Sequence, residues 1–301
     1  MKVRALAVVL LAGALAGCSI KRLAVNTLGS ALASGGDVYA GDDDPELIAG
    51  AVPFGLKTVE SLLAASPDNR DLLLAATSGF VQYSYAFVQC EADYIESQDF
   101  ARATAQRARA KKLYLRALAY GRRGLEAAHP GFEAALRKDA AAALAKTTAA
   151  DVPLLYWTGA AWGAAISSSK ENAELAADLG LVEALMRRAL QLDEGFGGGA
   201  IHDFFIAYDG GRPASAGGSR EKAREHLSRA LALAKGRRAA PFVSFAESVS
   251  VAAQDRKEFR ELLEKALEVD PDAARDQRLA NILAQRRARW LLSRVDELFL
   301  E

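Results

Sequence analysis

The chain lacks an excess of charge of either sign. Its 301 residues include 38 Lys and Arg and 38 Asp and Glu, so the formal net charge is +0. A protein that binds nucleic acid normally carries a basic stripe and a clear surplus of positive charge. The balanced composition therefore argues against a nucleic-acid partner. Hydrophobic residues make up 51% of the chain, which is enough for a substantial core.

Motifs for catalysis, cofactors and metals are also missing. The three histidines, His129, His202 and His226, are far apart in the sequence, and none has a second histidine at i+3 or i+4. The stretch "GFGGGA" (195–200) satisfies G-x-G-x-x-A but follows a helix end instead of a strand, which indicates a flexible connector. The contiguous acids of "GDDDP" (41–45) suit helix capping better than calcium. We predict no enzyme activity, no cofactor and no metal site.

Strand signals are nearly absent, whereas apolar residues recur with helical spacing along most of the chain. Asp44-Pro45-Glu46 is a typical helix start, with a capping Asp, a Pro in the first turn and an acid near the helix N-terminus. The sequence predicts an all-α fold of about eleven helices. They cover residues 44–65, 70–97, 99–128, 131–149, 152–168, 171–192, 199–209, 219–235, 239–253, 255–268 and 272–299.

Several helix ends resemble one another. "ALQLDEGF", "ALALAKGR" and "ALEVDPDA" begin at Ala189, Ala230 and Ala266, at steps of 41 and 36 residues. A tetratricopeptide (TPR) unit is a helix-turn-helix of about 34 residues that must stack on its neighbours to bury its apolar face. We therefore expect an irregular TPR-like solenoid of helical hairpins.

The N-terminus predicts export. Lys2 and Arg4 precede a run of 12 apolar residues, Ala5–Ala16, and "LAGC" ends at Cys18. Such a run is too short for a membrane span of about 20 residues and is typical of a cleaved signal. The cysteine after Leu-Ala-Gly resembles a bacterial lipobox, which implies lipidation of Cys18; the alternative is an ordinary signal peptide with a chance cysteine. Ser19 favours the outer membrane. Cys90, on an apolar helix, is predicted to be buried.

These observations predict three parts of the chain. Residues 1–17 form a lipoprotein signal peptide, residues 18–43 a lipidated tether, and residues 44–301 one TPR-like helical domain. Within the tether, 20–32 could form a short helix and the stretch from Ser34 is expected to be a loop; 209–219 is the long internal loop. The basic, amphipathic segment 278–299 is either a terminal solenoid helix with a solvated face or a helix that docks a partner.

The stretch "YWTGAAWGAAISSSK" (156–170) places two tryptophans among small residues. On a helix over 152–168 the rings of Trp157 and Trp162 lie on different sides, and apolar residues surround most of the helix, which predicts burial on several sides. The tryptophans could be core residues. Alternatively, at least one faces an internal apolar channel.

Two further groups of aromatics favour the channel. Phe80, Tyr83, Phe87 and Tyr94 follow helical spacing, and Phe204, Phe205 and Tyr208 form the other group. Helices rich in aromatics and poor in charge can enclose an apolar ligand, with tyrosine hydroxyls and indole N–H groups as polar contacts. The candidate ligand-binding residues are Tyr83, Phe87, Tyr156, Trp157, Trp162, Phe204 and Tyr208.

The chain resembles the T component associated with TRAP transporters, the TatT family. The stretches that carry the resemblance are "LAVNTLGSALASGGDVYAGDDDPELI", "LLAATSGFVQYSYAFVQ", "YWTGAAWGAAISSSK", "GGSREKAREHLSRALAL" and "LANILAQRRARWLLSRVDELF". The resemblance implies a bacterial lipoprotein of cryptic TPR-like repeats. It also implies a homotrimer with a pore or cavity in each subunit, and a periplasmic solute-binding P component as partner.

The sequence therefore predicts a non-enzymatic, membrane-anchored accessory of organic-solute uptake. It would take a small hydrophobic ligand into an aromatic-lined pore and pass it to the P component. The alternative is an adaptor lipoprotein that grips peptides in an open polar groove during envelope assembly.

Overall fold

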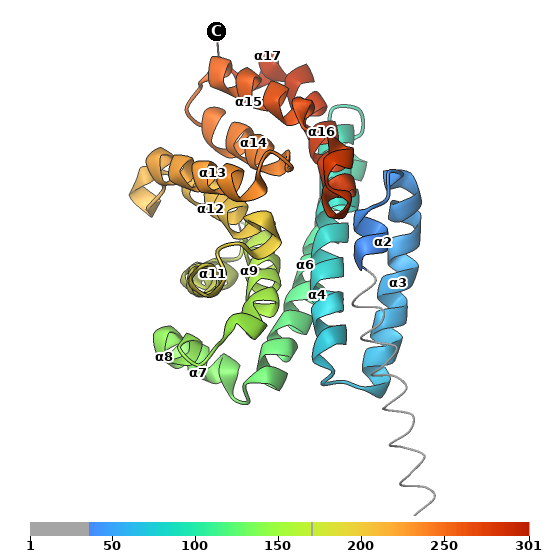
Figure 1. The fold of residues 1–301 in the computed structure, drawn as a ribbon, viewed down its shortest axis with the longest axis vertical. Helices are drawn as coiled ribbons and strands as arrows, with labels where there is room; N and C mark the ends of the chain where they lie inside the picture. Colours follow the sequence, from blue (N-terminus) through green and yellow to red (C-terminus); the bar gives the residue numbers. More distant parts are fainter. Residues whose placement is uncertain (1–35, 170, 301) are drawn as a thin grey trace, which may run out of the picture.

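The computed structural model describes residues 36–169 and 171–300, and every regular element in them is helical (Figure 1). The predicted all-α class is confirmed. The signal peptide, Cys18 and the helix expected at 20–32 lie outside the described residues. The α-helices are α2 (Gly36–Ala40), α3 (Pro45–Ala65), α4 (Arg70–Ser84), α5 (Cys90–Ile95), α6 (Phe100–Ala128), α7 (Phe132–Lys138), α8 (Ala140–Leu144), α9 (Val152–Ser167), α10 (Ala173–Ala177), α11 (Leu179–Leu192), α12 (Ala200–Gly210), α13 (Arg220–Ala234), α14 (Ala240–Phe245), α15 (Arg256–Glu268), α16 (Arg278–Ser293) and α17 (Val295–Leu298).

Shorter helical segments join them. Two are π-helical, η1 (Tyr85–Gln89) and η5 (Ala246–Ser250). The others are 3-10 turns: η2 (Ala149–Asp151), η3 (Phe196–Gly198), η4 (Ala214–Ala216), η6 (Pro271–Ala273) and η7 (Arg275–Gln277).

Side-chain caps fix where the main helices begin. The Asp44 carboxylate accepts a hydrogen bond from the Leu47 amide at 2.9 Å, as the sequence predicted. Such a cap satisfies a backbone N–H that has no partner within the helix. The same arrangement opens four other long helices, at Asn69, Asp99, Ser219 and Asp255.

Some predicted boundaries are wrong. The helix expected at 131–149 is two short helices, because Asp139 is extended (φ −155°) and its carboxylate caps α8 through the Ala142 amide. The segment 272–299 begins with two 3-10 turns, and α16 starts only at Arg278. The stretch after Ser34, expected to be a loop, contains the helix α2.

Close packing of α3, α4, α6, α9 and α11 forms the first half of the molecule. Helix α6 approaches its neighbours closely because two glycines face them: a Cβ at Gly121 would lie 2.4 Å from Thr158 Oγ1, and one at Gly124 would lie 2.6 Å from Leu154 Cδ2. A second hydrophobic cluster joins α12–α16. The two clusters meet on α12, where Phe205 belongs to the first and Ile206 to the second.

The row of helices curves back on itself. Helix α16 lies against α2 and α3 at the other end of the chain (Figure 1). Arg278–Asp43 at 2.9 Å and Arg286–Glu46 at 2.8 Å join α16 to the start of α3. Arg287–Asp93 at 3.0 Å and the Trp290 and Tyr94 rings, with centroids 5.4 Å apart, join it to α5. The segment 278–299 is therefore packed against the N-terminal helices as well as the preceding hairpin.

Two further features concern the membrane and the free thiol. Of the described helices, α3 has the length and apolar composition of a membrane span, and 22% of its apolar stretch is buried in the protein. The buried side chains of α3 include Ile48, Leu56 and Leu63. The prediction that Cys90 is buried is confirmed, because its side chain is 6% exposed and burial raises its pKa to about 12.

Candidate ligand-binding site

The two tryptophans of α9 occupy different environments. Trp162 is 1% exposed, and the guanidinium carbons of Arg122 and Arg137 lie 4.2 and 5.8 Å from its ring centroid. Trp157, in contrast, is partly exposed. The structure therefore places Trp162 in the core beneath two arginines, where it lines no accessible space.

One stripe of α9 stays accessible although the helix has neighbours on several sides. Tyr156, Trp157, Ala160, Gly163 and Ala164 follow helical spacing, and all are partly exposed. None of the five is charged. The stripe is therefore an apolar wall on a central helix.

Aromatic rings from other elements extend this wall. The Tyr156 ring lies 4.9 Å from that of Trp157 and 5.1 Å from that of Phe196 in η3. Phe204 of α12 lies over Gly163, where an added Cβ would be 3.4 Å from the Phe204 ring. Tyr156 and Trp157 thus lie together with Phe196, which the sequence did not single out, and Phe204 of α12 packs against the same helix farther along, at Gly163.

The remaining candidates lie elsewhere or are occupied. Tyr208 is 9% exposed, and its hydroxyl donates a hydrogen bond to Glu183 at 2.8 Å under the guanidinium of Arg212. Tyr83 and Phe87 form a separate pair with centroids 5.9 Å apart, and Arg109 donates to the Tyr83 hydroxyl at 3.2 Å. The structure therefore divides the seven candidates into an α9–α12 group, a Tyr83–Phe87 pair and two packed side chains.

Tyr85, which the sequence did not single out, is the accessible aromatic of η1. Its side chain is 49% exposed, yet its pKa is well above its usual range because of Cys90, burial and Glu247. The π-helical turn adds a residue, so helical spacing extrapolated from α4 is out of phase after Ser84. Spacing alone therefore selects Tyr83 and Phe87 instead.

A polar cluster surrounds Tyr85. Arg287 of α16 is 8% exposed, lies 3.0 Å from Asp93 through Nη1, and donates through Nη2 to Glu247 of η5. The neighbouring Tyr114 hydroxyl donates to Gln89 at 2.7 Å, and burial raises the Tyr114 pKa well above its usual range. Both π-helical segments contribute to this cluster, and π-helical turns are frequent at functional sites.

A second ion pair lies beside the aromatic wall. Arg238 donates to Asp203 of α12 and, at 3.1 Å, to the Gly198 carbonyl. Burial raises the pKa of Asp203, and burial together with Asp203 raises the pKa of Tyr156 to about 12. Elements α9, α12, η5, α16 and η1 therefore present a mixed set of aromatic and charged groups.

Comparison with known proteins places this arrangement in a family. The model of the TRAP transporter T-component family matches residues 41–299. The chain belongs to the TRAP transporter T-component family. An uncharacterized protein of Treponema pallidum (strain Nichols) is 32% identical over 311 residues, covering 95% of this chain and 94% of that protein. The family supports an accessory role in TRAP-type transport and a place in the cell envelope.

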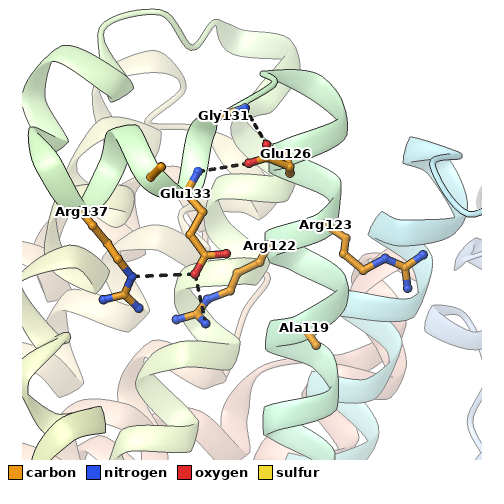
Figure 2. A pocket seen from close by; sticks show the side chains of 8 residues that line it. Ala119, Arg122, Arg123, Glu126, Gly131, Glu133 and Arg137 are labelled. Atoms are coloured by element: carbon orange, nitrogen blue, oxygen red, sulfur yellow. Dashed lines mark hydrogen bonds and ion pairs between the residues drawn. The ribbon is translucent and has the colours of Figure 1, made fainter.

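The open hollow of about 670 Å³ between α6 and α7 of this T component is lined by five charged residues and three small ones (Figure 2). Its charged groups have partners within the protein, and Arg123 donates to the Pro67 carbonyl at 2.8 Å. Glu133 lies 3.4 Å from Arg122 and 3.8 Å from Arg137, and the Glu126 carboxylate accepts from the Gly131 and Glu133 amides, which lowers its pKa. This hollow lacks the aromatic lining expected for an apolar ligand.

The T component also brings two distant histidines together. His202 and His226 face each other with their Nδ1 atoms 2.8 Å apart, and His202 Nε2 lies 3.2 Å from Glu194. Burial lowers both pKa values, that of His226 to about 4. The described part of the chain contains no group of three or more His, Cys, Asp or Glu residues that could hold a metal ion.

Proposed function

We propose that this T component is a non-enzymatic lipoprotein that binds a small hydrophobic ligand in an internal passage and cooperates with a periplasmic solute-binding P component. The lipid on Cys18 would anchor it, with the outer membrane as the expected location. Residues 44–301 would act as one TPR-like domain in each subunit of a homotrimer. These finer statements extend the family membership of residues 41–299.

The observation that carries the proposal is the accessible aromatic wall of α9. Tyr156, Trp157 and Phe204 are apolar, partly exposed and located on central helices, in a row of helices that closes through α16. Accessible apolar surface costs about 25 cal/mol per Å² when it faces water. A hydrophobic ligand that covered this wall would remove that cost. Ligand binding therefore accounts for the accessibility of these side chains, whereas core packing does not.

The adaptor alternative has less support. A peptide-gripping groove would present polar side chains along a concave face. The hollow between α6 and α7 is the nearest candidate, but Glu133 already pairs with Arg122 and Arg137, and Glu126 accepts from the Gly131 and Glu133 amides. A peptide would have to break those pairs to bind there.

A substitution of Trp157 tests the passage. We expect Trp157→Ala to weaken binding of the fluorescent apolar probe phenylnaphthylamine about tenfold, because it removes a large part of the wall. Probe titration measures the affinity, and circular dichroism checks that helicity is retained. The matched control is Phe100→Ala, which removes a 70% exposed aromatic at the start of α6. Equal affinity in the wild type and a folded Trp157→Ala variant would rule out the α9 wall as the binding surface.

A further inference from the structure

The proposed passage would be apolar along α9 and charged along η5, α12 and α16. The α9 stripe contains no ionisable group other than the Tyr156 hydroxyl, whereas η5, α12 and α16 contribute Glu247, Asp203 and Arg287. A ligand that covers both sides would have an apolar body and a polar head. The charges of the polar side decide which head it can accept.

Both arginines on this side are already engaged. Arg287, whose side chain is 9% exposed, is held between Asp93 and Glu247. Arg238, whose side chain is 10% exposed, donates to Asp203 and to the Gly198 carbonyl. Arg287 Nη1 is buried and makes no hydrogen bond with the described residues, although it lies 3.0 Å from Asp93. A ligand carboxylate would therefore have to compete with Asp93 for Arg287, and with Asp203 for Arg238.

The carboxylates, in contrast, retain accepting capacity. The Glu247 side chain is 35% exposed in spite of its ion pair, and Asp203 Oδ1 is buried with no hydrogen-bond partner among the described residues. The cluster around Tyr85 contains one cation, Arg287, and two anions, Asp93 and Glu247. Adding the Arg107–Glu96 pair, which joins Asp93 at 3.0 Å, gives two cations and three anions. Either count leaves one negative charge in excess.

We infer that the wall formed by η1, η5 and α16 receives a head group that donates hydrogen bonds, an ammonium or a hydroxyl, and disfavours a carboxylate. The inference rests on the proposed function, since it names the chemical class of the ligand for the same passage. The ligand is then an apolar amine or alcohol. Its tail would lie along the α9 wall and its head near Tyr85 and Glu247.

Three competitors with the same tail test this. Decylamine, decanol and decanoate, each below its micellar concentration at pH 7, compete with phenylnaphthylamine for the full-length protein in detergent. We expect decylamine to displace the probe at about a tenfold lower concentration than decanoate, because one uncompensated charge in a partly desolvated site is worth at least that factor. Decanol should also displace the probe more readily than decanoate.

Variants that remove one charge or one hydroxyl test which residues cause the preference among the three competitors. Glu247→Gln keeps the shape and removes the excess charge, so the preference for decylamine over decanoate should disappear while decanol competes as before. Tyr85→Phe leaves the Arg287 ion pairs in place and should weaken decanol alone, which covers the case that Glu247→Gln fails to fold. The matched control is Glu261→Gln, the same change at an exposed glutamate on α15.

The outcomes separate the two proposals. If the wild type takes up no probe, the apolar passage itself is wrong. If the probe binds and the three competitors are equivalent, or decanoate is the strongest, the passage stands and the head-group inference is overturned. A preference for decylamine that persists in folded Glu247→Gln also overturns the role given to Glu247.

Discussion

The histidine pair, of which His202 is buried and His226 partly exposed, ties α12 to the following helix α13. Only one proton can lie between two Nδ1 atoms 2.8 Å apart, so the two imidazoles cannot both be protonated in the folded state. His226 also stacks on the Phe205 ring at 4.9 Å, which limits its access to water. The charged groups nearest the pair are Glu194, Asp209, Arg187 and Arg229.

This pair predicts a loss of stability in mild acid. The folded-state pKa of His226, about 4, lies below the ordinary value of 6.5, so the unfolded chain binds more protons between these values. The free energy of unfolding should therefore be constant above pH 6.5 and fall by up to about 3 kcal/mol as the pH decreases toward 4.

Urea unfolding at pH 7 and pH 4.5 measures this loss. In His226→Phe, which preserves the stacking surface against Phe205, the decrease between the two pH values should be smaller than in the wild type. Other carboxylates titrate in the same range, so the difference between the two proteins is the quantity to compare. Identical decreases in both would show that the pair contributes nothing to acid sensitivity.

For single residues, the sequence predicted the properties that depend on neighbouring positions in the chain. Burial of Cys90 followed from its apolar helix, and the prediction held. The roles of Trp157 and Trp162 could not be separated, because both lie among small residues, and what distinguishes them is the pair of α6 and α7 arginines over Trp162. Those arginines lie 40 and 25 positions before Trp162. Helical periodicity in the sequence does not predict contacts between residues so far apart.

At the scale of elements, glycines set the separation between α6 and its neighbours. A Cβ at Gly121 would lie 2.4 Å from Thr158 Oγ1 and 3.1 Å from Thr77 Cγ2, so α4, α6 and α9 would have to shift. Gly50, in contrast, lies within α3, and no atom is within 4 Å of its added Cβ.

The two glycines predict opposite effects of the same substitution. Gly121→Ala should destabilise the protein by about 1–3 kcal/mol through overpacking. Gly50→Ala should stabilise it by about 0.5–1 kcal/mol, because alanine loses less backbone entropy in a helix. Thermal unfolding of the two variants beside the wild type measures both. A stabilising Gly121→Ala would mean that the three helices are not packed as closely as described.

Helix starts were predictable, and interruptions were not. Asp44 predicts the start of its helix because the capping hydrogen bond joins residues only three positions apart. Asp139 has the same chemistry but lies inside an apparently continuous apolar pattern, so its helix break was missed. The π-helical turn at 85–89 leaves no local signal, and with it the exposure of Tyr85 was also missed.

At the scale of the whole molecule, membrane attachment depends on one proposed modification. One acyl chain binds a bilayer only marginally, whereas two or more anchor a protein stably. Cys18→Ser should therefore move the protein from the membrane fraction to the soluble fraction, as measured by fractionation and immunoblotting. The matched control, Cys90→Ala, removes the buried thiol and should leave the protein in the membrane fraction. Retention of Cys18→Ser would reject lipid anchoring.

The all-α class followed from composition and periodicity over the entire chain. The return of α16 to the N-terminal helices did not, because it depends on pairs such as Arg278–Asp43 and Trp290–Tyr94, which are about 200 residues apart or more. A repeat pattern predicts contacts between neighbouring hairpins only, so it does not predict contacts between segments this far apart.

The meeting of the two chain ends has a consequence for biogenesis. If the polypeptide is exported N-terminus first, α3 to α15 leave the export channel before α16, the helix that closes the row. Contacts between such remote segments form late and slowly. Until α16 docks, the row of helices would stay open at α2 and α3, so the closed arrangement can form only after nearly the whole chain has been exported.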